Sequence, residues 1–147
     1  MPTPESRRLL LHNDLAELQR LAEWIDGWAQ QALSSDLSFA VQLCLEEAVA
    51  NVIMYGGSAR DRLEIAVEVE DNDATLIARV VDNGRPFDPT ETLPPPKASS
   101  LAQARIGNLG IHLMRSFASS MQYERRDGCN RLTLRFSEPQ LERPRAG

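Results

Sequence analysis

The stretch Leu43-Cys44-Leu45-Glu46-Glu47-Ala48-Val49-Ala50-Asn51-Val52-Ile53 is apolar at helical spacing and carries Glu47 and Asn51 four residues apart. Apolar residues that recur at steps of three or four favour an amphipathic helix. Ser34-Ser35-Asp36 offers an N-terminal cap before it, and Gly56-Gly57 ends it. On this helix the side chains of Glu47 and Asn51 project from one face, one turn apart.

The patterns on either side of this helix predict an α+β fold in which a mostly antiparallel sheet is covered by three helices, as a two-layer sandwich. A single domain is expected over residues 7–137, followed by a disordered tail at 138–147. The other predicted elements are a strand at 7–12, a helix capped by Asn13 or Asp14 and reaching residue 32, strands at 63–69 and 75–81, a helix at 111–121, and strands at 122–126 and 131–136.

Composition excludes several classes of function. The chain has 147 residues and a net charge of −5, which disfavours nucleic-acid binding through phosphate neutralisation. Lys97 is the only lysine, so a phosphate-binding loop ending in Gly-Lys-Ser/Thr is excluded. Apolar runs are short and no export signal opens the chain, so we expect no membrane segment and a cytoplasmic location.

Glu47 and Asn51 are the first candidate site residues. Their oxygens suit a hard cation such as Mg²⁺, and the Glu47 carboxylate beside it is able to accept a proton. Taken alone, a glutamate and an asparagine four residues apart are more often a solvated helix face.

The second candidate is Asp82-Asn83-Gly84, which follows an apolar strand. An ionised aspartate at a strand end is able to accept a hydrogen bond from the exocyclic amine of adenine, and Gly84 permits close approach to the backbone. By itself, the segment also fits an ordinary turn.

The third candidate is Gly107-Asn108-Leu109-Gly110, preceded by Arg105, at the expected start of a helix. Backbone N–H groups at a glycine-rich helix start form an anion site. A glycine pair alone is weak evidence, because Gly110 also suits close packing of a helix on a sheet.

The order of the three segments resembles the Bergerat ATP-binding fold, shared by gyrase, heat-shock chaperones of the ninety class, histidine kinases and mismatch-repair ATPases. Glu47 and Asn51 match its N box, Asp82 and Gly84 its G1 box, and Gly107 and Gly110 its G2 box, with residues 85–106 as an ATP lid. The chain departs from the pattern at Arg85-Pro86-Phe87, where a second glycine is usual, at Asn108, and at Tyr55.

Residues 7–136 together resemble the bacterial anti-sigma factor serine/threonine kinases. The resemblance implies an enzyme that uses ATP and Mg²⁺ to phosphorylate a serine on a small anti-anti-sigma protein, binds a sigma factor, and forms a homodimer. It implies Glu47 as the catalytic base and Asn51 as the metal ligand. The ATP-binding residues that it implies are Asn51, Asp82, Gly84, Phe87, Arg105, Gly107, Asn108, Leu109 and Gly110.

Two rival functions use the same pocket. One is a nucleotide-gated binding module that sequesters a sigma factor or another regulator without phosphorylating anything, and the other is a simple ATPase. Glu47 favours the kinase, because ATP binding alone requires no general base.

Overall fold

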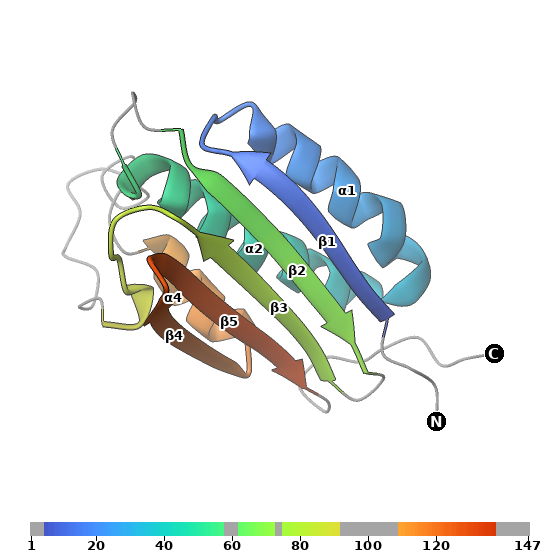
Figure 1. The fold of residues 1–147 in the computed structure, drawn as a ribbon. Helices are drawn as coiled ribbons and strands as arrows, with labels where there is room; N and C mark the ends of the chain where they lie inside the picture. Colours follow the sequence, from blue (N-terminus) through green and yellow to red (C-terminus); the bar gives the residue numbers. More distant parts are fainter. Residues whose placement is uncertain (1–4, 58–61, 73–74, 92–108, 138–147) are drawn as a thin grey trace, which may run out of the picture.

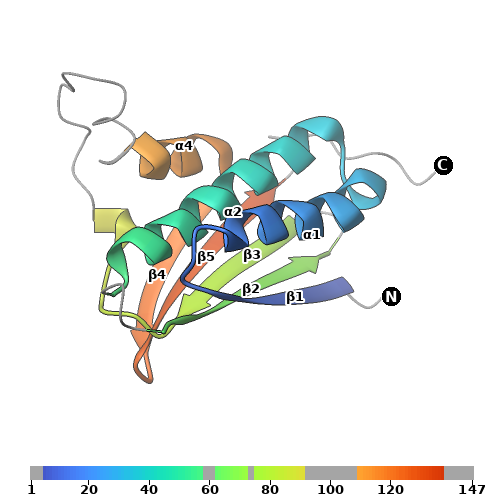
Figure 2. The same cartoon turned by 90° about the horizontal axis from the view of Figure 1, so that it is seen from above.

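The structure, a computed structural model, describes residues 5–57, 62–72, 75–91 and 109–137. These residues form two layers, with the helices on one face of a five-stranded sheet (Figures 1 and 2). The elements in chain order are β1 (Glu5–His12), α1 (Glu17–Ala32), α2 (Ser35–Tyr55), β2 (Glu64–Asp71), β3 (Thr75–Asp82), the short 3₁₀ helix η1 (Pro89–Glu91), α4 (Leu109–Phe117), β4 (Ser120–Arg126) and β5 (Cys129–Ser137). The predicted α+β sandwich is confirmed.

The sheet has the strand order β1-β2-β3-β5-β4, and all neighbouring strands are antiparallel. Its inner face follows from alternation along the strands: in β3, Leu76, Ala78, Val80 and Asp82 are buried while the residues between them are partly exposed. Asp82 is therefore the last inward-facing residue of an otherwise apolar strand, which places a carboxylate at the edge of the core.

The central helix of the covering layer is α2, which lies between α1 and α4 in Figure 2. Ser34 caps it as predicted, its hydroxyl accepting a hydrogen bond from the Leu37 N–H. By length and hydropathy alone, α2 is the one helix in the described part of the chain that could cross a membrane. Seven of its residues are buried, and the helix packs on α1, α4 and the sheet.

The predicted end of one helix and the predicted cap of another were wrong. The helix expected at 111–121 ends at Phe117, because Ser119 already hydrogen-bonds to the Arg135 carbonyl and Met121 pairs with Leu134 in the sheet. Neither Asn13 nor Asp14 caps α1, whose N-cap position is Ala16. The Asn13 side chain instead accepts a hydrogen bond from the Leu63 N–H, which ties the β1–α1 turn to the start of β2.

Candidate functional site

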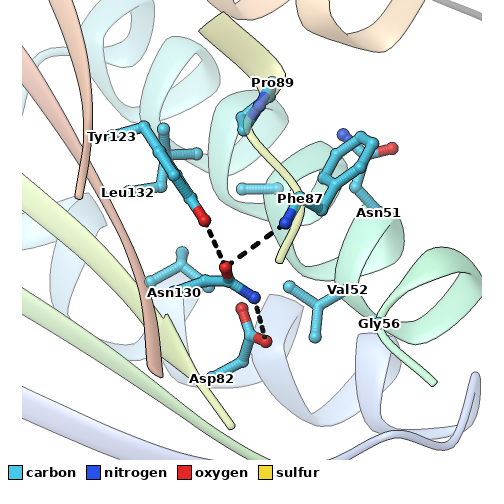
Figure 3. Close-up of a pocket in the computed structure, with 11 residues that line it drawn as sticks. Asn51, Val52, Gly56, Asp82, Phe87, Pro89, Tyr123, Asn130 and Leu132 are labelled. Carbon is cyan, nitrogen blue, oxygen red and sulfur yellow. Dashed lines mark hydrogen bonds between the residues drawn. The ribbon is translucent and has the colours of Figure 1, made fainter. Parts of the chain in front are cut away.

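A pocket of about 400 Å³, its open mouth included, lies between α2 and the strands β3, β4 and β5 (Figure 3). Its walls are mainly apolar and its floor is polar, as is typical of small-molecule sites. The lining residues are Ala48, Asn51, Val52, Gly56, Val80, Asp82, Phe87, Pro89, Tyr123, Asn130 and Leu132. The structure thus brings Asn51, Asp82 and Phe87 together, as the sequence indicated.

Asp82 forms the floor of the pocket and is only 4% exposed. Its Oδ1 accepts two hydrogen bonds, from the Gly84 N–H at 2.9 Å and from Asn130 Nδ2 at 3.0 Å. Burial raises the pKa of the Asp82 carboxyl, while these two hydrogen bonds and the charge of Arg125 oppose the rise. One carboxylate oxygen is therefore held by the protein, and none of the described residues donates a hydrogen bond to Oδ2.

Asn130 is the site residue that the sequence analysis missed. It is 5% exposed and links Asp82 to the Arg85 carbonyl, the Phe87 N–H, Tyr123 and Arg125. The signal in the sequence was a polar residue at an inward position of the apolar strand β5. In the structure this residue pairs directly with Asp82 of β3. Asn130 ties the floor of the pocket to the segment that follows Asp82.

Gly84 is required by close packing between two backbone segments. A Cβ at this position would lie 2.5 Å from the Gly56 carbonyl oxygen and 2.9 Å from Asp82 Oδ1. The neighbouring Arg85 N–H donates a hydrogen bond of 2.7 Å to the same carbonyl of Gly56. Gly84 therefore joins the start of the loop to the end of α2, and this contact is the geometric reason for the glycine.

Phe87 closes one side of the pocket. Its ring stacks on that of Tyr55, with centroids 5.6 Å apart and planes at 22°, and its N–H donates to Asn130 Oδ1 at 3.3 Å. Tyr55 and Arg85-Pro86-Phe87 are two of the departures from the family pattern, and the stacked rings of Tyr55 and Phe87 bring the two into contact.

Asn51 lies on the helical wall, and its Nδ2 is buried with no hydrogen-bond partner. A buried amide without a partner costs free energy unless a ligand completes its hydrogen bonding. The free Nδ2 donor suits an acceptor such as a phosphate oxygen of a nucleotide, whereas a Mg²⁺ ion bound with that nucleotide would take the Asn51 Oδ1. Among the described residues, no group of three or more His, Cys, Asp or Glu is arranged to hold a metal ion by itself.

Glu47 lies one turn before Asn51, outside the lining of the pocket, and its carboxylate is packed directly against Gly110 in the first turn of α4. A Cβ on Gly110 would collide with Glu47 Oε2. The N box and the start of α4 therefore meet at this carboxylate. Cys44 is a buried residue of the same helix as Glu47. Burial and the charge of Glu47 raise the pKa of its thiol to about 12, so this cysteine is an inert core residue.

The other predicted site residues are only partly visible. Arg105, Gly107 and Asn108 lie outside the described residues, as do residues 92–106 of the lid predicted at 85–106 and the tail 138–147. Leu109 is the first residue of α4.

A two-layer sandwich with a buried aspartate below a helix that carries Glu47 and Asn51 defines a nucleotide-binding domain of the ATPase class. The model of the histidine kinase-like ATPase domain matches residues 11–136, and the chain belongs to this family. A serine/threonine-protein kinase of Bordetella bronchiseptica, BtrW, is 37% identical over 112 residues, which are 76% of this chain and 79% of that protein.

Among solved structures, the fold is similar to the histidine kinase domain from the blue-light activated histidine kinase EL346 of Erythrobacter litoralis, with a TM-score of 0.53 and 16% identity. The match covers 85% of this chain and 61% of that chain, so this chain spans less than two thirds of its length. At this identity the likeness shows the fold alone.

Proposed function

We propose that this chain is an ATP-dependent protein-serine kinase that acts as an anti-sigma regulatory factor. The observation that carries the proposal is the place of Glu47: a carboxylate one helical turn from Asn51 and packed against the start of α4. Binding of ATP alone would require no general base one turn from Asn51. The similarity to a protein named as a serine/threonine-protein kinase supports the same choice.

In the proposed mechanism, Asp82 Oδ2 accepts the exocyclic amine of adenine, and the apolar walls from α2 and β5 enclose the base. Asn51 would hold Mg²⁺, which would neutralise phosphate charge during transfer. Gly110, and by family resemblance Arg105 and the segment 107–109, would bind the phosphates.

Glu47 acts on the substrate rather than on the nucleotide. The serine oxygen of the partner attacks the γ-phosphorus, the bond between that phosphorus and the bridging oxygen of ADP breaks, and the Glu47 carboxylate takes the serine proton. ADP and a phosphoserine are the products. Most of the acceleration in such transfers comes from position and charge neutralisation, so the carboxylate must be held in place.

The proposed partner is a small anti-anti-sigma protein with a phosphorylatable serine, in a partner-switching module that also includes a sigma factor. A homodimer, a cytoplasmic location and independence from nucleic acid and membrane belong to the same proposal. The net charge of −5 agrees with the lack of a nucleic-acid footprint.

The test is incubation of the protein with ATP labelled on the γ-phosphate and with a small anti-anti-sigma protein that carries a phosphorylatable serine. Label on a serine of that protein is expected. Label on neither protein would support the sequestering module instead, and free labelled phosphate that forms without the partner would support a simple ATPase. The Glu47→Gln variant is the matched control, because it keeps the shape of the side chain and removes its basicity.

A further inference from the structure

The partners of Asn130 fix the orientation of its amide. Its Oδ1 receives hydrogen bonds from the Phe87 N–H at 3.3 Å, Arg125 Nη1 at 3.2 Å and the Tyr123 hydroxyl. A backbone N–H and a guanidinium only donate. On the other side, Nδ2 donates to Asp82 Oδ1 at 3.0 Å and to the Arg85 carbonyl at 2.8 Å, and that carbonyl only accepts. A reversed amide would break bonds on both sides.

This network holds the Asp82 carboxylate in one orientation. The Gly84 N–H and Asn130 Nδ2 both bind Oδ1, so rotation of the carboxylate would cost both bonds. In Figure 3, Asn130 lies between Asp82 and the pair formed by Tyr123 and Phe87. The acceptor geometry offered to a base is thus set by Asn130 and not by Asp82 alone.

The same amide also fixes the chain that follows Asp82. Asn130 holds the Arg85 carbonyl and the Phe87 N–H, while Arg125 Nη1 donates to the Gly84 carbonyl at 2.7 Å. The segment Gly84–Phe87 lacks the second glycine of the family pattern, and side chains of β4 and β5 secure it instead. The floor and the Phe87 wall of the pocket are thereby joined into one unit.

We propose that Asn130 is a positioning residue that sets nucleobase selectivity, by holding the Asp82 carboxylate and the Gly84–Phe87 segment in one geometry. The inference rests on the function proposed above, in that Asp82 is taken as the acceptor of the adenine amine. In this proposal Asn130 makes no contact with the nucleotide. The test therefore measures the preference for one nucleotide over another rather than the affinity for either one.

The experiment measures by calorimetry the affinities for ATP and for purine riboside triphosphate, which lacks the exocyclic amine. Wild type is expected to prefer ATP by about tenfold or more, the value of a hydrogen bond to a buried carboxylate. Asn130→Asp keeps the acceptor for Phe87, Tyr123 and Arg125 but turns an oxygen toward Asp82, so the preference should fall to near unity. Tyr123→Phe is the control, since it leaves the bond between Asn130 and Asp82 in place and should retain the preference.

Equal loss of affinity for both nucleotides in Asn130→Asp, with the preference intact, would overturn the inference and leave Asn130 a structural residue. If Asn130→Asp fails to fold by circular dichroism, the preference is measured in Asn130→Ser, which adds no charge, and is judged in the same way. A wild type without preference would overturn both this inference and the adenine role of Asp82. Absence of transfer to a partner serine, with the preference present, would count against the kinase alone.

Discussion

At the scale of single residues, Asp82 combines function with a cost in stability. Its carboxylate is buried at the end of an apolar strand, and burial raises its pKa above the ordinary value. An acid whose pKa is raised in the folded state binds its proton more readily when folded than when unfolded. Its contribution to stability therefore grows as pH falls through the folded pKa toward the unfolded one, and declines as pH rises.

Asp82→Asn should consequently raise the free energy of unfolding at neutral pH while weakening ATP binding by about 1.5–3 kcal/mol. The amide oxygen takes over the bonds from Gly84 and Asn130, and the charge is gone. Thermal melts across pH provide the check. The stability difference between variant and wild type should shrink toward acid pH, and a difference that is constant with pH would contradict the account, as would unchanged ATP affinity.

Gly110 offers a second prediction at this scale. In Gly110→Ala the new methyl group occupies the place of Glu47 Oε2, and the flexible carboxylate moves away. Alanine favours a helix, so stability should hold or rise. Phosphate transfer to the partner should fall by roughly 10²-fold, the usual cost of a small displacement of a catalytic group. Transfer at the wild-type rate would show that the position of Glu47 against α4 is unimportant.

At the scale of elements, the end of α2 and the loop after β3 are held together by backbone contacts. Gly84 is the contact point, because its Cα faces the carbonyl of Gly56 at a distance that excludes a side chain. This junction holds Asp82 below Asn51, although the two residues are 31 positions apart (82 − 51) in the chain.

Gly84→Ala should therefore destabilise the protein by about 1–3 kcal/mol through overpacking and also weaken ATP binding. Gly27→Ala, in the interior of α1, is the matched control: no atom lies within 4 Å of the new methyl group. That variant should gain about 0.5–1 kcal/mol, because alanine is the better helix former. Chemical denaturation measures both, and equal stability of Gly84→Ala and wild type would contradict the close-packed junction.

The sequence predicted the two layers and the two local hairpins because alternation and helical spacing are local signals, strong in β3 and α2. It placed Asn51 and Asp82 in one pocket through their resemblance to known boxes. It did not predict the end of α4, since pairing of Ser120 and Met121 with β5 outweighs local helical preference. It missed Asn130, whose partners come from residues up to 48 positions away and exist only in the folded chain.

At the scale of the whole molecule, the site is built from the core itself. The residues that line the pocket come from α2 and the Gly56 that follows it, from β3, β4 and β5, and from Phe87 and Pro89. The helix α2 packs on α1, α4 and the sheet through its seven buried residues (Figure 2). Glu47 and Asn51 lie one turn apart on this helix, and under the proposed function Asn51 serves binding while Glu47 serves the chemistry.

The rate of phosphate transfer by Glu47→Gln at saturating ATP tests this division most directly. The variant keeps the size of the side chain, so ATP affinity should match wild type, whereas Asn51→Ala should lose Mg²⁺-dependent affinity. Without a general base, transfer to the partner serine by Glu47→Gln should be slower by about 10²–10⁴-fold. Transfer by Glu47→Gln at the wild-type rate would contradict the account.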